Sequence, residues 1–293
     1  MTLEQLRLFV AVAEREHLTR AAEALNLTQS AASSAIAALE ARHGIVLFDR
    51  VGRGLRLTEA GRRLLPEARA VLARAEAARQ VLHDMADLTQ GSLSIAASQT
   101  LASWWLPPMI VRFRRAFPGI ALSLTAGNSR EVVAEVSGHR ADLGFIEGGE
   151  PVAALIDRPV GGDALHLVVA PGHPWAGATP DAGALAQGDW VMRERGSGTR
   201  AHMDAALAAL GVAAPEAGRL LELPTNEAVR QAVLAGGGAS LLSQLVVGAD
   251  LAEGRLVGLA LPPAPRAFRL LRHPERHLSH AAQAFLRSLE AGA

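Results

Sequence analysis

Residues 18–40 read LTRAAEALNLTQSAASSAIAALE, and this stretch decides the fold of the N-terminal part of the chain. Thr19 and Thr28 can each cap a short helix, because a threonine hydroxyl accepts hydrogen bonds from the free backbone N–H groups of a first helical turn. Ile36 and Leu39 then lie on one face of the second helix. Two short helices joined by a tight turn, the second with small polar residues outward, predict a helix-turn-helix.

The flanking residues extend this pattern. Upstream, the apolar residues that share one face of a predicted first helix are Leu6, Phe9, Val10 and Ala13. Downstream, a basic and glycine-punctuated segment containing Arg50, Arg53 and Arg56 reads as a hairpin. Residues 1–58 are therefore predicted to form an all-α winged helix-turn-helix domain.

A long, arginine-rich linker helix is predicted from Thr58 to about Leu88. Its apolar residues alternate steps of four and three, and we call them the heptad seam: Leu64, Ala68, Val71, Ala75, Ala78, Leu82 and Met85. Pro66 is expected to kink this helix or to lie near its start, since proline lacks a backbone donor. We assign residues 59–90 to a linker that pairs two chains, although packing of the helix on its own domain remains an alternative.

After Gly91 the pattern of apolar residues changes to one typical of alternating strands and helices. Strands are predicted over 93–97, 120–125 and 143–146, and helices over 101–117 and 129–137. In a second set, strands are predicted over 166–170, 190–192 and 239–242, and helices over 199–210 and 227–234. The β-α-β-α-β order of the first set predicts a parallel sheet, and the two sets together predict two α/β lobes.

Residues 91–293 are thus predicted to form two lobes joined by crossing segments near 160–163 and 265–268. Lobe I comprises 91–161 and 267–293, and lobe II comprises 162–266. Ligands of such sheets bind in the cleft between the lobes.

The composition narrows the function classes. At 293 residues and 49% hydrophobic content, the chain can bury two cores. It has no run of about 18 apolar residues and no signal-peptide layout, so we expect a cytoplasmic protein without a membrane span. It contains no cysteine, lysine or tyrosine, which excludes disulfides, thiolate nucleophiles and Schiff-base chemistry. The 29 basic and 29 acidic residues balance, so any DNA affinity must come from a local patch.

The N-terminal block resembles the LysR-type transcriptional regulators. The matching residues are Leu6, Phe9, Ala21-Ala22, Leu25, Thr28-Gln29-Ser30-Ala31, Ile36, Leu39-Glu40, Gly44, Leu47-Phe48, Arg50, Gly52-Arg53, Leu57-Thr58 and Gly61. The rest of the chain resembles the family's two-lobed effector domain, which is like the periplasmic binding proteins. The segments Gly127–Ser129, Gly144–Gly148 and Arg193–Arg200 look like the sulfur-metabolism members of the CysL/YeiE type. Carbon-fixation regulators of the CbbR type share the Gly-Ser-Gly-Thr-Arg element.

The resemblance implies which residues contact double-stranded DNA. Bases would be read by the start of the third helix, through Gln29, Ser30, Ser33 and Ser34. Phosphates would pair with the wing arginines, Arg50, Arg53 and Arg56. Many members carry proline at the position of Ser30 and arginine at that of Ser34, and a serine cannot make the bidentate arginine contact to guanine. The resemblance also implies a homodimer or homotetramer.

A small anionic effector is expected in the cleft. Two polar turns, Ser98-Gln99-Thr100 and Ser197-Gly198-Thr199, each follow a predicted strand and offer hydroxyls and backbone donors. We expect them to face each other and hold sulfite or another sulfur oxyanion, as the resemblance implies. Further polar residues at the site are predicted to be Asn128, Ser129, Glu147 and Asn226. Glu147 would repel an anion, so we expect it to orient a donor or to be protonated.

Metal, nucleotide and catalytic sites have weaker support in the sequence. His273, His277 and His280 lack a companion carboxylate pattern and favour solvent exposure over a metal site. Gly236-Gly237-Gly238 lacks the lysine of a nucleotide loop and favours a tight turn. No cofactor and no catalytic residue is predicted. A solute-binding protein for transport remains an alternative for the C-terminal part, and an enzyme acting in the cleft is a third class without an evident nucleophile or base.

Overall fold

The computed structural model describes residues 1–51, 54–84, 91–149, 151–213, 215, 217–259 and 264–290. The chain divides into two compact units, one over Met1–Ala86 and Gly138–Arg140 and the other over Asp87–Ser137 and Ala141–Ala293.

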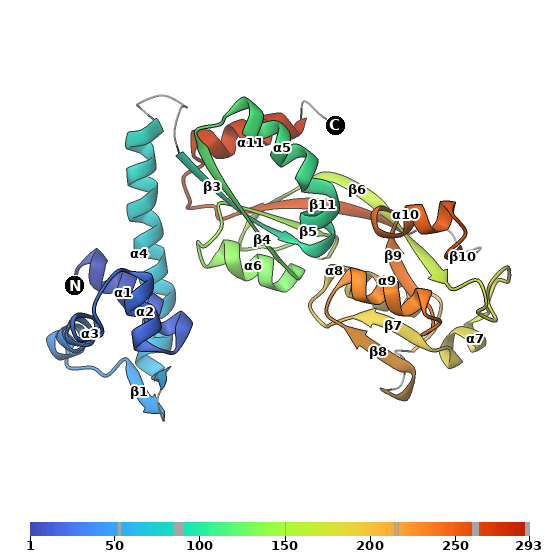
Figure 1. Ribbon diagram of the computed structural model, residues 1–293, viewed down its shortest axis with the longest axis horizontal. Helices are drawn as coiled ribbons and strands as arrows, with labels where there is room; N and C mark the ends of the chain where they lie inside the picture. The colour runs from blue at the N-terminus through green and yellow to red at the C-terminus, as the bar shows by residue number, and fades with distance from the viewer. Residues whose placement is uncertain are drawn as a thin grey trace. The chain divides into compact units, whose positions relative to one another are not determined.

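The first unit is a winged helix-turn-helix followed by a long helix (Figure 1). Its elements are α1 (Leu3–Arg15), α2 (Leu18–Ala24), α3 (Gln29–His43), β1 (Phe48–Val51), β2 (Gly54–Leu57) and α4 (Glu59–Asp84). The strands β1 and β2 form the predicted antiparallel hairpin. Fully buried side chains from several helices, including Phe9, Val12 and Leu39, form one core.

Helix caps account for the boundaries of these helices. Thr28 caps α3 as predicted, with its hydroxyl accepting from the backbone N–H of Ala31. The prediction that Thr19 caps α2 was wrong, because α2 begins at Leu18 and its cap is His17, two residues before Thr19. The chain turns sooner than expected since Glu16 takes the left-handed conformation (φ 49°) that ends α1.

Part of the heptad seam of α4 packs against the core of its own domain. Ala68 is 1% exposed and lies in the core, with Leu64 packed against it, and Arg69 forms an ion pair with Glu14 of α1 at 2.8 Å. Val71 is 43% exposed. Pro66 lies inside the helix. Met85 and the side chain of Leu82 lie outside the described part of the chain.

Lobe I of the second unit is built on three parallel strands. They are β3 (Gly91–Ser98), β4 (Ile120–Gly127) and β5 (Leu143–Glu147), in the order β5-β3-β4. The helix α6 spans Ser129–Ser137, as predicted. The helix predicted over 101–117 is divided into a π-helical turn (Leu101–Trp105) and α5 (Leu106–Ala116), because Pro107 and Pro108 cannot donate backbone hydrogen bonds to the preceding turn.

Two long antiparallel strands connect the lobes. They are β6 (Ile156–Val169) and β11 (Ala264–Arg272), paired along their length with Gly162 opposite Ala267. The predicted crossing segments, near 160–163 and 265–268, lie within these two strands. The prediction of parallel pairing holds for β3, β4 and β5, but β11 pairs antiparallel with both β5 and β6.

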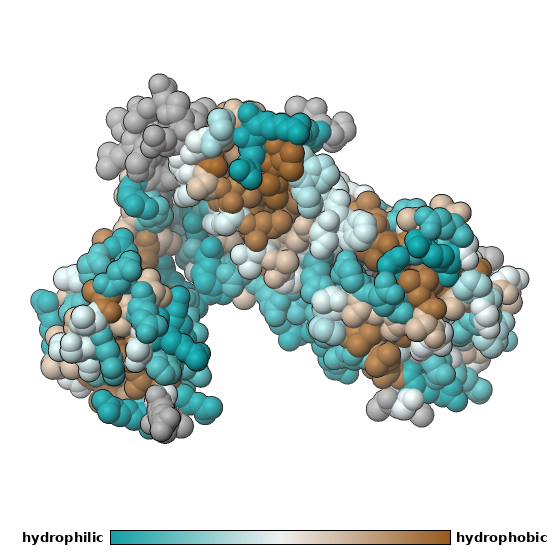
Figure 2. All heavy atoms as spheres, viewed as in Figure 1, coloured by the Kyte–Doolittle hydropathy of each residue, from teal (hydrophilic) through white to brown (hydrophobic). Residues whose placement is uncertain are grey.

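Lobe II completes the domain. Its elements are α7 (Ala182–Gln187), β7 (Trp190–Arg193), α8 (Gly198–Ala209), a 3-10 turn (Ala217–Arg219), β8 (Leu220–Leu223), α9 (Asn226–Leu234), β9 (Ser240–Ser243), α10 (Gln244–Ala252) and β10 (Val257–Gly258). The chain then returns through β11 to α11 (His280–Glu290), whose buried residues join the lobe I core. In Figure 2, hydrophobic side chains reach the surface of lobe I near α5 and α11. The sequence pattern had not predicted α7, β8 or α10.

Candidate functional site

The start of α3 presents the predicted base-reading residues to solvent. Gln29, Ser30, Ser33 and Ser34 are exposed because the buried residues of α3 turn its opposite face to the core. The hydroxyl of Ser30 lies 3.1 Å from that of the capping Thr28, so these two hydroxyls are hydrogen-bonded to each other. Most of the visible surface of this unit is hydrophilic in Figure 2.

The hairpin places one predicted phosphate contact beside α3. Arg50 is exposed and lines a hollow of about 380 Å³ together with Gln29 and Ser33. His17 and Thr19 line the same hollow, and sequence reasoning did not assign them to it. Arg56 is also exposed but lies opposite the acidic Asp49 in the hairpin register. Arg53 lies outside the described residues.

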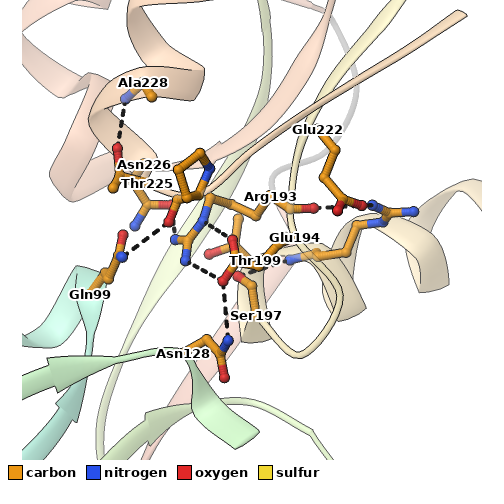
Figure 3. A network of polar contacts seen from close by, with 12 residues as sticks. Gln99, Asn128, Arg193, Glu194, Ser197, Thr199, Glu222, Thr225, Asn226 and Ala228 are labelled. Carbon is orange, nitrogen blue, oxygen red and sulfur yellow. Dashed lines mark hydrogen bonds and ion pairs between the residues drawn. The ribbon is translucent and has the colours of Figure 1, made fainter. Parts of the chain in front are cut away.

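A chain of polar contacts, here called the inter-lobe network, joins the two lobes of the second unit (Figure 3). Asn226 of lobe II donates to the Thr100 hydroxyl of lobe I at 3.0 Å and accepts from Nη1 of Arg193 at 2.9 Å. Nε and Nη2 of Arg193 donate to both carboxylate oxygens of Glu194, at 2.8 and 2.9 Å. Asn128 of lobe I donates to Oε1 of Glu194 at 3.3 Å.

Electrostatics favour the charged form of Glu194 in this network. Burial by itself raises the pKa of Glu194. The hydrogen bonds from Arg193 and Asn128 and the positive charge of Arg193 outweigh that effect, so the pKa of Glu194 lies below its ordinary value.

The turn Ser197–Thr199 makes different contacts from those predicted. The hydroxyl of Thr199 accepts from Nη1 of Arg266, in the crossing strand β11, at 3.1 Å. A Cβ atom placed on Gly198 would lie 2.7 Å from the carbonyl oxygen of Glu147 and 2.8 Å from the Ser129 hydroxyl. This turn therefore meets Ser129 and Glu147 of lobe I, whereas Thr100 meets Asn226.

Glu147 lies against the N-terminus of α8, where an anion had been predicted. It is 3% exposed, and its Oε1 lies 3.8 Å from Nη1 of Arg266. Arg266 is itself held by two hydrogen bonds to Asp163, at 2.8 and 2.6 Å. The carboxylates of Glu147 and Asp163 thus face the start of α8, so an anion in the adjoining opening would have to be held by arginines and not by this helix N-terminus.

A second opening, here called the inter-lobe pocket, has a volume of about 560 Å³. Four of the predicted effector residues line it: Ser129, Glu147, Ser197 and Gly198. Arg130 and Arg195 also line it, and neither forms an ion pair with any described residue. The buried hydroxyl of Ser129 has no hydrogen-bond partner among the described residues. Apolar side chains, among them Val133 and Ile146, line another part of its wall, and the ion-paired Arg200 and Asp204 line it as well.

Sequence reasoning missed the buried arginines of the cleft. The prediction rests on the hydroxyls of the Arg193–Arg200 segment, but its Arg193 and Arg200 are buried and paired with Glu194, Asp204 and Glu222. An arginine next to a predicted strand end is a usable signal, since a buried guanidinium requires acidic partners. The hydroxyl of Ser98 and Oε1 of Gln99 are buried without partners in the described part of the chain.

The remaining candidates do not form sites in the residues that the structure describes. Within them, no three histidine, aspartate or glutamate side chains are arranged to hold a metal ion, and no helix is long and apolar enough to cross a membrane. The Gly236–Gly238 segment is a tight turn, with φ values of 85° at Gly236 and 126° at Gly238.

Comparison with known families identifies the family to which the chain belongs. Residues 3–62 match the model of the bacterial regulatory helix-turn-helix proteins of the lysR family, and residues 86–293 match the LysR substrate binding domain. The chain belongs to the LysR family. It is a LysR-type transcriptional regulator with an effector-binding domain, and LysR regulators bind DNA.

Relatives match this LysR-family protein over nearly its full length. The Escherichia coli (strain K12) regulator YeiE is 38% identical over 289 residues, covering 98% of this chain and 96% of YeiE. The Rhodospirillum rubrum regulator CbbR is 33% identical, covering 99% of this chain and 96% of CbbR.

Solved structures share its fold. CbnR complexed with its target DNA has a TM-score of 0.69 at 22% identity, covering 100% of both chains. The regulatory domain of Synechocystis PCC6803 CcmR in complex with 2-PG has a TM-score of 0.62 at 29% identity, covering 69% of this chain and 97% of that domain.

Proposed function

We propose that this LysR-type regulator binds a promoter operator in cytoplasmic double-stranded DNA as a homodimer or homotetramer, and that a small anion in the inter-lobe pocket modulates this binding. Residues 1–58 would bind DNA, residues 59–90 would link and pair two chains, and residues 91–293 would bind the effector. The observation that supports the effector proposal is the buried Ser129 hydroxyl beside Arg130 and Arg195, for which the described residues provide neither a hydrogen-bond partner to the hydroxyl nor an ion pair to the arginines.

The exposed residues of α3 and the wing support the DNA contacts. Gln29 and Ser33 lie beside Arg50 around one hollow, so a base-reading amide and a phosphate-binding guanidinium share one face of the domain. The similarity to CbnR, whose structure was solved with its target DNA, agrees with this use of the fold.

The pocket favours an effector with an anionic and an apolar part. Arginines suit carboxylate, phosphate and sulfur oxyanions. The resemblance of three segments to the sulfur-metabolism members implies sulfite or another sulfur oxyanion as a first candidate. A phosphorylated small acid is a second candidate, because the pocket of about 560 Å³ exceeds the size of sulfite and has apolar walls. The CcmR domain that was solved with 2-PG supports this second candidate.

The DNA proposal is tested with two substitutions. Arg50→Ala should weaken binding about equally on all sequences, because phosphates carry no sequence information. Gln29→Ala should relax base preference at one operator position by about 1–3 kcal/mol. Binding to a randomised operator library by both variants measures the difference. Specific binding that survives removal of residues 1–58 would refute the assignment.

The effector proposal is tested by titrating sulfite, sulfate, thiosulfate and phosphorylated small acids into the full-length protein by calorimetry. The variant Arg130→Gln/Arg195→Gln should lose at least tenfold in affinity for the anion that binds wild type. A matched control is Arg114→Gln/Arg115→Gln, which removes two exposed arginines from α5 and should bind normally. Equal loss in both variants would indicate a general charge effect, and no binding at millimolar concentration would reject the pocket.

A further inference from the structure

Glu194 occupies an unusual position between the lobes. Its carboxylate accepts three hydrogen bonds, two from Arg193 of lobe II and one from Asn128 of lobe I (Figure 3). None of these three residues lines the inter-lobe pocket. The contact is therefore separate from the effector site proposed above.

The two donors are positioned by residues other than Glu194. The Arg193 side chain is 3% exposed, and its Nη1 is held by Asn226, whose own amide donates to Thr100. The remaining edge of the guanidinium, Nε and Nη2, presents the parallel pair of donors that matches a carboxylate.

Asn128 is held in the same way in lobe I. Its Oδ1 accepts from the backbone N–H of Glu131 at 3.0 Å, and its backbone N–H donates to the Glu131 carboxylate at 2.8 Å. This pair of bonds turns the Asn128 amide nitrogen toward Glu194. Arg193 and Asn128 thus form a receptor for an oxyanion whose parts come from different lobes.

Glu194 is well placed to occupy this receptor as a side chain of the same chain. It directly follows β7, which ends at Arg193, and its side chain is 26% exposed. Because one side of Glu194 already faces solvent, its carboxylate can leave the receptor without the packing around it opening, whereas Glu147 is 3% exposed.

We propose that Glu194 acts as a tethered ligand: its carboxylate fills an oxyanion receptor built by Arg193 and Asn128 and so holds the two lobes together. Closure of the effector domain then depends on an acidic side chain of the chain itself as well as on the effector. The class of free ligand that the emptied receptor takes is a short carboxylate such as formate or acetate.

The test is chemical rescue of full-length Glu194→Ala. The midpoint of thermal unfolding should fall by about 4 °C relative to wild type. Sodium formate or acetate should restore most of this loss, and sodium chloride at equal ionic strength should not. Wild type should show no such formate response. Rescue should disappear in Glu194→Ala/Asn128→Ala, because the lobe I donor is then absent.

Two further variants make the result decisive. Glu222→Ala removes a half-exposed carboxylate that pairs with Arg200 within lobe II, so it should show no formate response. Glu194→Gln keeps the shape of the side chain, fills the receptor with an amide and should also be insensitive to formate. If Glu194→Ala does not fold alone, formate should restore its soluble yield on refolding. Formate that fails to stabilise Glu194→Ala, or that stabilises Glu222→Ala equally, overturns the proposal.

Discussion

At the scale of single residues, Gly198 permits the close approach of the lobes. A Cβ atom there would lie 2.7 Å from the Glu147 carbonyl oxygen. Gly198→Ala should therefore force the lobes apart and lower the free energy of unfolding by about 1–3 kcal/mol. Urea denaturation measures this change. The control is Gly172→Ala, where a Cβ atom meets nothing within 4 Å. An equal effect of both substitutions would contradict the proposed steric cause.

Asp250 gives a pH-dependent prediction at the same scale. Hydrogen bonds from Arg230 and the nearby positive charges of Arg230 and Arg255 lower the pKa of Asp250, although burial opposes them. The folded-state pKa is below the unfolded value of about 3.9, so the stabilisation is complete above that pH and is lost as the pH falls through the lowered value. Wild type should therefore lose more stability between pH 6 and 3 than Asp250→Asn, which lacks the titrating group. Parallel loss in urea denaturation at both pH values would contradict this.

At the scale of elements, α4 places the residues of the heptad seam in two environments. Ala68 lies in the core of its own unit and Val71 is 43% exposed, so the two residues should respond differently to a charge. Val71→Asp should weaken dimerisation at least tenfold, about 1.4 kcal/mol, with the fold intact. Ala68→Asp should unfold the unit. Analytical ultracentrifugation and circular dichroism separate these outcomes, and Val71→Ala is the conservative control. Unchanged sedimentation of Val71→Asp would remove the pairing role of α4.

Elements with a local signal could be predicted from the sequence. The Thr28 cap marked the start of α3, and the helix predicted over 129–137 is α6, whose Val132 and Val136 are buried. The long strands β6 and β11 were harder to predict. Pro159, Gly161, Gly162 and Pro265 interrupt the usual strand pattern, and only pairing between the two strands stabilises an extended conformation there.

At the scale of the whole molecule, the balanced net charge predicts that DNA binding depends on a local surface. If a dimer makes about six phosphate contacts, its affinity should fall about a thousandfold between 50 and 200 mM salt. Arg50→Ala should reduce the slope of log K against log salt by about one for each contact that is lost. Fluorescence anisotropy with an operator duplex measures both slopes. A slope near zero would contradict an electrostatic interface.

The sequence by itself determined the family, the helix-turn-helix, the parallel strands of lobe I and the general position of the cleft. These features have local causes, namely caps, periodicity and strand order. Only the tertiary structure decided which polar groups meet: Thr100 with Asn226, Glu194 with Asn128, and Arg266 with Asp163. These pairs join residues 126, 66 and 103 positions apart. Their partners are set by how the lobes pack around the crossing strands, because a buried charge or amide pairs with whatever the fold brings within hydrogen-bond distance, and no local pattern encodes that choice.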